Sequence, residues 1–343
     1  MPFYQAINGR TAEGKRTING CLRLREALED SIPRKTQDAT LLLASWNLRE
    51  FGGSKYGGRD LEPLIYIAEI LSRFDVIAVQ EVRDDLDNLD YLMRLLGGWW
   101  KYLVSDVTFG RSGNSERTAF IYDSRKISFG GLAGELVPET KKKNGMYVTD
   151  EAFSRSPFLA GFRAGWFKFT ICSSHMFYGK NSANVKQRHK DAELAARLLK
   201  KRMKQNDRWA NNAILLGDFN VFNTSDETFL ALTRNDFQIP ANLHGKYTNA
   251  KQDKPFDQIA FIAPDVSRQL DVAEAGVFPF FDFVYRDEDE SEYPKEKPSH
   301  RYKTARTYKM SDHLPIWCQL QIDFSDDYLK RKRRLASQIE RNS

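Results

Sequence analysis

The chain has 343 residues, of which 41% are hydrophobic and 13% aromatic, so it is long and apolar enough to bury a full core. Its formal net charge of +6 favours an anionic partner, because surplus lysine and arginine raise the local concentration of phosphate-bearing ligands. This surplus is mild, so charge alone does not assign a nucleic acid as the partner.

The three cysteines, Cys21, Cys172 and Cys318, fit neither a disulfide framework nor a zinc site, because they are odd in number and far apart. We expect reduced, mostly buried thiols. No apolar run approaches the roughly 18 residues that span a bilayer, and the N-terminus lacks the basic-then-apolar pattern of a signal peptide. These features predict a soluble, cytoplasmic protein without a membrane partner, which we assume to be a monomer.

The predicted elements begin with a polar N-terminal extension, residues 1–38, that has a helical stretch at 22–28. From residue 39 to 324, short runs rich in β-branched and aromatic residues alternate with segments that carry an apolar residue every three or four positions. The predicted strands are 40–44, 75–79, 118–122, 158–162, 166–173, 213–216, 258–263 and 316–322. The predicted helices are 61–73, 86–96, 184–203 and 224–232.

Several of these strands are continuously apolar, which predicts burial on both faces. The pattern therefore indicates an α/β (α+β) fold in which two stacked sheets are flanked by helices within one domain. Residues 286–304 are dense in charge and proline, and we expect a mobile loop there. Residues 325–343 predict a basic C-terminal helix or tail, whose cluster at 330–334 is more typical of a solvated helix face than of a nucleic-acid clamp.

Polar side chains stand at six predicted strand ends, where the chain leaves the core. Taken singly, each has an ordinary structural explanation, since Gly-Asp-Phe-Asn can form a turn and Ser-Asp-His-Leu-Pro can cap a helix. Together they supply a complete set for metal binding and acid–base chemistry, with no serine or cysteine nucleophile signature beside them. These residues are Asn47, Glu81, His175, Asp218, Asn220, Asp257, Asp312 and His313.

In this order, the motifs resemble the endonuclease/exonuclease/phosphatase superfamily and, within it, the deoxyribonuclease I branch. The likeness runs from about residue 40 to 322. Arg49 and His175 favour that branch, because the abasic-site endonucleases carry aspartate and asparagine there. The stretches that carry the resemblance are 46–52, 79–84, 102–105 with 110–117, 153–157, 217–220, 256–259 and 311–315.

The resemblance implies a four-layer αββα sandwich and a divalent-metal-dependent phosphodiesterase that hydrolyses nucleic acid, with DNA as the expected substrate. Such an enzyme must neutralise the phosphodiester charge, orient a water and accommodate the leaving alkoxide. By this resemblance Glu81 holds Mg²⁺ or Mn²⁺, with Asn47 and Asp312 beside it. Asp218 positions the attacking water or a second metal, and Asn220 donates to the phosphate.

The resemblance also implies two histidine–carboxylate pairs. His313, oriented by Asp257, is the expected general base, and His175, oriented by Glu116, is its partner acid or a phosphate ligand. Guanidinium groups within the family-like stretches are expected to bind substrate phosphates together with Asn47. These arginines are Arg49, Arg83, Arg111 and Arg155.

The sequence departs from the family pattern at three places. Asn114 replaces the minor-groove tyrosine, and Lys-Lys-Lys-Asn-Gly at 141–145 replaces the loop that carries a small disulfide in the secreted nucleases. The charged segment 286–304 is longer than the pattern suggests, and we hypothesise that it gates the site or selects substrate ends.

Two other functions remain open. A phosphatase or phospholipase-type diesterase of the same superfamily would act on an inositol phosphate or sphingomyelin with the same core chemistry, although Arg49 and Arg155 favour nucleic acid. A non-catalytic nucleic-acid-binding module is disfavoured, because a scaffold does not need this set of side chains together.

Overall fold

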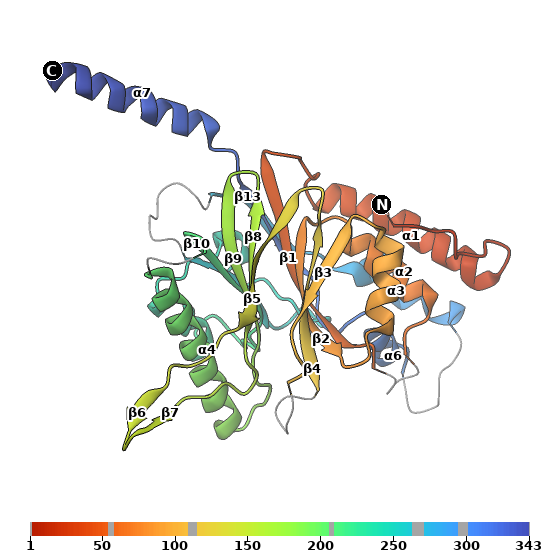
Figure 1. The fold of residues 1–343 in the computed structure, drawn as a ribbon. Coiled ribbons are helices and arrows are strands. Elements are labelled where there is room, and N and C mark those ends of the chain that lie inside the picture. The colour runs from red at the N-terminus through yellow and green to blue at the C-terminus, as the bar shows by residue number, and fades with distance from the viewer. Residues whose placement is uncertain are drawn as a thin grey trace.

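A computed structural model describes residues 2–53, 58–108, 115–205, 209–262, 271–293 and 301–342, with side chains up to residue 334. Two β-sheets are stacked at its centre and helices cover their outer faces (Figure 1). The predicted fold class, two stacked mixed sheets flanked by helices, is therefore confirmed. No helix in these ranges is long and apolar enough to cross a membrane.

The first sheet has six strands in the order β12-β13-β1-β2-β4-β3, in which only β1 and β2 are parallel. In chain order these strands are β1 (Thr40–Phe51), β2 (Val76–Arg83), β3 (Trp100–Val104), β4 (Glu116–Asp123), β12 (Asp271–Val277) and β13 (Ile316–Gln321).

The second sheet has five strands in the order β11-β10-β9-β8-β5, in which only β9 and β10 are parallel. A separate two-stranded hairpin lies between β5 and β8 along the chain. The strands are β5 (Ile127–Glu135), the hairpin strands β6 (Lys141–Lys143) and β7 (Met146–Val148), β8 (Phe158–Ala164), β9 (Phe167–His175), β10 (Asn212–Asp218) and β11 (Asp257–Ile262).

Helices α1 to α3 cover the first sheet and α4 covers the second (Figure 1). The α-helices are α1 (Ala12–Ser31), α2 (Leu61–Leu71), α3 (Asp87–Leu96), α4 (Ser182–Met203), α5 (Glu227–Arg234), α6 (Tyr302–Lys309) and α7 (Ser325–Asn342). Short 3₁₀ turns are η1 (Ala241–Leu243), η2 (Phe280–Asp282) and η3 (Asp287–Glu292).

Strand β1 shows why the central strands are apolar throughout. Successive side chains of a strand point to opposite faces, so Leu41 and Leu43 enter the core between the sheets, whereas Leu42 and Ala44 enter the core under α1 to α3. Both faces of the strand are therefore buried, as the sequence predicted.

The peripheral segments differ from the sequence expectations. Helix α1 spans 20 residues and buries Leu24 and Leu28 against the first sheet's helical layer, whereas the sequence indicated only 22–28. In the segment 286–304, expected as a loop, η3 and the start of α6 are helical, and residues 294–300 lie outside the described ranges. Helix α7 extends away from the body beyond the end of β13 (Figure 1).

Candidate active site

The site lies where strand ends of the two sheets meet. Asn47 and Glu81 come from β1 and β2 of the first sheet, and the register pairs Asn47 with Gln80. In the second sheet Asp218, the last residue of β10, is paired with His175 on one side and with Asp257 on the other. The stacking of the two sheets then joins residues 171 positions apart, as in the hydrogen bond between Asn47 and Asp218.

Local backbone irregularities aim the side chains into the site. The pairing of β2 with β4 shifts between Val79 and Val82, and Glu81 within this bulge has a φ of 59°. A positive φ is uncommon for a non-glycine residue and collects at functional sites. Gly217 has a φ of 132°, and a Cβ there would lie 2.0 Å from the Ser174 carbonyl oxygen, so the residue before Asp218 must be glycine.

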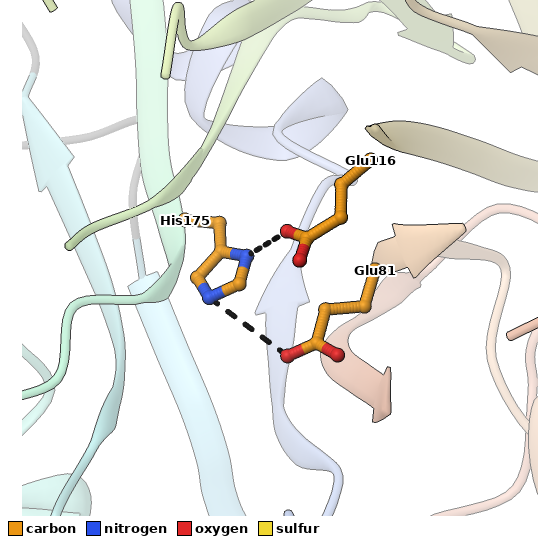
Figure 2. A group of neighbouring side chains, drawn as sticks. All are labelled: Glu81, Glu116 and His175. Carbon is orange, nitrogen blue, oxygen red and sulfur yellow. Dashed lines mark ion pairs between the residues drawn. The ribbon is translucent and has the colours of Figure 1, made fainter. Parts of the chain in front are cut away.

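His175 lies between two carboxylates (Figure 2). Its Nδ1 is 2.9 Å from Glu116 Oε2, and its Nε2 is 3.9 Å from Glu81 Oε1 and 3.5 Å from Asp218 Oδ2. Burial and the nearby Arg155 lower the pKa of His175, but the carboxylates of Glu116 and Asp218 outweigh them, so the pKa is raised overall.

His313 forms the second histidine–carboxylate pair. Its Nδ1 is 2.8 Å from Asp257 Oδ2, and the same oxygen accepts a hydrogen bond from Thr248 Oγ1 at 2.6 Å. Burial alone would lower the pKa of His313, but the Asp257 and Asp218 carboxylates raise it well above its ordinary value. The bond at Nδ1 directs Nε2 toward Asp218 Oδ2, 3.6 Å away.

Asp218 is the point on which both pairs converge. Its Oδ2 faces the Nε2 atoms of both imidazoles and accepts a hydrogen bond from Asn47 Nδ2 at 3.2 Å, while its Oδ1 accepts one from the Asn220 backbone N–H at 2.9 Å. The Asn220 side-chain amide donates to the Met176 carbonyl at 2.9 Å, which ties the end of β10 to the end of β9.

The oxygen-rich part of the site suits a hard cation. Glu81, Glu116 and His175 offer atoms within 4.8 Å of one another, as do Asp218, Asp257 and His313. Among the described residues, no lysine or arginine pairs with Glu81 or Asp218, so their negative charge is concentrated. Carboxylate oxygens in this arrangement could hold a divalent cation.

Asn47 and Asp312, which were also predicted to lie at the metal, each contact another residue of the site. The Asn47 amide nitrogen donates to Glu81 Oε1 at 2.8 Å, so Asn47 holds the two carboxylates in place and turns its oxygen toward the Arg49 N–H. Asp312 is more exposed, with 42% of its side chain accessible, and lies 3.5 Å from the Arg49 guanidinium.

The predicted substrate-binding arginines contact different parts of the site. Arg155 reaches the inner site, with Nε 3.6 Å from Glu116 Oε2. Arg83 pairs with Glu50 at 3.1 Å near the end of β2. Arg49 lies on the ring of Tyr308, and Arg111 lies outside the described residues.

Sequence reasoning missed Arg59, which joins two segments of the site. Its guanidinium donates to the carbonyls of Leu48, of Arg49 at 2.9 Å and of Met310 at 3.0 Å, and its Nε donates to the Lys309 carbonyl at 2.9 Å. No motif could have identified it, because Arg59 joins β1 to the end of α6, and Lys309 in α6 lies 250 positions after Arg59 in the chain.

The sequence matches the Endonuclease/Exonuclease/phosphatase family over residues 44–287. The match covers well over half of the chain and includes every strand except β13 and the start of β1, and six of the eight site residues, all but Asp312 and His313. The chain therefore belongs to the endonuclease/exonuclease/phosphatase superfamily of hydrolases, which act on phosphodiester or phosphate-ester bonds.

Curated relatives include deoxyribonuclease-1 from several animals. The chain is 37% identical to the Rattus norvegicus enzyme over 95 residues, which is 26% of this chain and 32% of the relative. It is 28% identical to the Bos taurus enzyme over 192 residues, which is 53% of this chain and 61% of the relative. The chain therefore spans less than two thirds of the length of these relatives, and the similarity is distant.

Solved structures share the fold at low sequence identity. An endonuclease/exonuclease/phosphatase family protein from Bacteroides thetaiotaomicron has a TM-score of 0.56 and 20% identity, covering 84% of this chain and all of its own. A mannosyl-6-phosphatase from the same organism has a TM-score of 0.54 and 20% identity, covering 81% of this chain and 98% of its own. These similarities show the fold alone.

Proposed function

We propose that this chain is a divalent-metal-dependent phosphodiesterase that hydrolyses nucleic acid, with a DNA endonuclease as its specific form. One observation carries the proposal: two histidines, each backed by a carboxylate, present Nε2 to the same oxygen of Asp218. Two imidazoles facing one small volume suit an in-line displacement at phosphorus, which needs one group beside the attacking water and another beside the leaving oxygen.

His313 acts as the general base in this proposal. Asp257 holds its Nδ1, which fixes the tautomer and leaves Nε2 directed at the volume beside Asp218. Phe256 packs against the ring with centroids 5.6 Å apart and limits its rotation. Asp218 orients the attacking water, since its Oδ2 is 3.6 Å from His313 Nε2.

His175 acts on the opposite side, as the partner acid or as a phosphate ligand. Glu116 holds its Nδ1, so its proton-bearing Nε2 faces the phosphate position. The raised pKa of His175 favours the cationic form of the ring, which suits contact with an anionic oxygen. Arg155, next to Glu116, adds a second positive charge at this position.

Glu81 would hold Mg²⁺ or Mn²⁺, together with Asp218 or Asp312. Such a cation supplies charge neutralisation at the phosphate and offsets the carboxylates that raise the pKa of both imidazoles. Asn47 keeps Glu81 and Asp218 at a fixed separation through its two hydrogen bonds.

Nucleic acid is supported as substrate by the arginines at and around the site and by the similarity to deoxyribonuclease-1. The alternative is a phosphatase or lipid-headgroup diesterase with the same core. The Asn114 departure from the nuclease pattern favours that alternative, and a mannosyl-6-phosphatase shares the fold.

A substrate panel tests the proposal. Purified protein is assayed with Mg²⁺, Mn²⁺ or EDTA on supercoiled plasmid, linear duplex, single strand, RNA, sphingomyelin and inositol and sugar phosphates. We expect metal-dependent nicking of plasmid that EDTA abolishes and that His175→Ala and His313→Ala each reduce by about 10²- to 10⁴-fold.

His189→Ala is the matched control, because His189 also pairs with a carboxylate, Asp226 at 3.0 Å, but outside the site. It should keep full activity. Hydrolysis of phosphate monoesters or lipid headgroups without any nicking would assign the substrate to the alternative class.

A further inference from the structure

The β6–β7 hairpin projects from the body beside α4 (Figure 1). It lies between β5 and β8, which pair at Glu135 and Phe158, so its two ends return to the edge of the sheet from which Arg155 enters the site. Its turn is formed by Asn144 and Gly145, whose φ values of 50° and 83° suit the two-residue turns that connect tight hairpins.

The hairpin carries positive charge that its surroundings leave unpaired. The acidic residues that flank it are already in ion pairs at 2.6–2.9 Å, namely Glu139 with Lys201, Asp150 with Lys143, and Glu151 with Arg197. The ammonium groups of Lys141 and Lys142 make no ion pair or hydrogen bond with the described part of the chain. Both side chains are exposed.

The register of the hairpin places an aromatic ring beside one of these lysines. Lys142 is directly opposite Tyr147, so the two side chains share one face, and Lys143 is opposite Met146 on the other face. Tyr147 is 74% exposed and Met146 is 66% exposed. Exposed aromatic and apolar side chains interleaved with lysines are the combination that binds nucleic-acid backbones and bases.

We propose that the β6–β7 hairpin is a nucleic-acid contact outside the catalytic centre, in which Lys142 and Tyr147 on one face contact a backbone phosphate and a base or sugar, and Lys141 on the other face contacts a neighbouring phosphate of the same substrate. This inference rests on the proposed function. A bilayer is the less suitable partner, because Met146 and Tyr147 are adjacent in a strand and point to opposite faces. Neither face therefore offers the continuous apolar surface that insertion requires.

The hairpin is close enough to contact the substrate that occupies the site. The chain from Val148 to Arg155 can span at most about 25 Å, which corresponds to about seven base pairs along a duplex. A duplex that extends about seven base pairs from the cleaved bond is therefore long enough to contact the hairpin, which projects from the body (Figure 1).

The test compares long and small substrates. Variants Lys141→Glu/Lys142→Glu and Tyr147→Ala are assayed on a duplex of about 30 base pairs and on bis(p-nitrophenyl) phosphate, and duplex binding is measured by fluorescence anisotropy in EDTA. We expect KM and Kd for the duplex to rise on the order of ten-fold for each variant, with kinetics on the small diester unchanged. For the double variant, the slope of log Kd against log salt should fall by about two.

The control variants reverse the same number of charges, or remove one exposed aromatic ring, at positions outside the hairpin. Lys101→Glu/Lys168→Glu reverses two exposed lysines near strand ends opposite the site, and Trp166→Ala removes an exposed ring from the turn between β8 and β9. These controls should bind the duplex like the parent protein. Equal duplex affinity and salt slope in parent and hairpin variants would overturn the proposal, as would loss of binding to phosphatidylserine vesicles with duplex binding intact.

Failure of the proposed function gives a different result. A parent protein that hydrolyses the small diester but neither binds nor cuts the duplex refutes the nucleic-acid assignment, and the hairpin proposal fails with it. A parent protein that cuts the duplex with no contribution from the hairpin refutes the hairpin proposal alone.

Discussion

The Arg49 guanidinium lies on the ring of Tyr308, with its central carbon 3.7 Å from the ring centroid. The same group donates to Thr307 Oγ1 and lies 3.5 Å from Asp312, so α6 holds it at the edge of the site. A held guanidinium loses less conformational entropy when it binds a phosphate.

Tyr308→Leu should therefore weaken substrate binding more than it slows chemistry. A cation–π contact of about 0.5–2 kcal/mol corresponds to a rise in KM of about two- to thirty-fold. Steady-state kinetics on duplex DNA give KM and kcat separately. Tyr328→Leu on α7, far from the site, should change neither, and an unaltered KM in Tyr308→Leu would remove the role of α6 in holding Arg49.

Arg59 should act as a positioning residue, because it links the carbonyls at the end of β1 to those at the end of α6. Lysine keeps the positive charge but cannot donate to several carbonyls at once as the planar guanidinium does. Arg59→Lys should therefore destabilise the fold by about 1–3 kcal/mol and lower kcat. Denaturant unfolding and kcat below the unfolding temperature separate the two effects. Wild-type kcat in a destabilised variant would show that Arg59 is structural only.

Glu81→Gln should weaken the binding of Mg²⁺ or Mn²⁺, because the amide retains the shape of the side chain and removes its charge. We expect the metal concentration that gives half-maximal activity to rise at least about ten-fold. A metal titration followed by both activity and Tm checks this independently of turnover. Glu139→Gln, at an exposed ion pair, serves as the control. An unchanged metal dependence would place the cation elsewhere.

Asp123 supplies a test of pH dependence away from the site. Burial alone would raise its pKa, but hydrogen bonds from Arg125 and Lys35 lower it well below its ordinary value. A carboxyl whose folded pKa is lowered stabilises the protein above its unfolded pKa of about 3.9, and this stability is lost as pH falls below it. The difference in Tm between parent and Asp123→Asn should therefore be largest near neutral pH and shrink below about pH 4. A constant difference would contradict this.

The candidate site motifs were predictable from sequence because each stands at the end of a strongly apolar strand, and strand ends of stacked sheets meet. In the structure Asn47, Glu81, His175, Asp218 and His313 lie together, while their chemical roles stay predictions. The sequence did not indicate β3, β5 and β12, which are all edge strands. Their faces are partly exposed, so they lack the continuous apolar run that identified the other strands, including β11, an edge strand whose residues are all buried.

The contacts made by α6 were also beyond sequence reasoning. The interaction of Arg49 with Tyr308 and that of Arg59 with Met310 join segments about 250 positions apart with no shared periodicity. They depend on how the charged segment before α6 folds, and its composition predicted a loop rather than the helical turns of η3 and α6.

The most direct test of the account is the kcat of Asp218→Asn for plasmid nicking with saturating Mg²⁺ or Mn²⁺. Both imidazoles face Asp218 Oδ2, so replacing this carboxylate with an isosteric amide should lower kcat by about 10²- to 10⁴-fold while the Tm stays near that of the parent. Asp236→Asn, at an exposed residue paired with Lys200, should be fully active. A folded Asp218→Asn protein that nicks plasmid at the parental rate would contradict the assignment of this cluster as the catalytic centre.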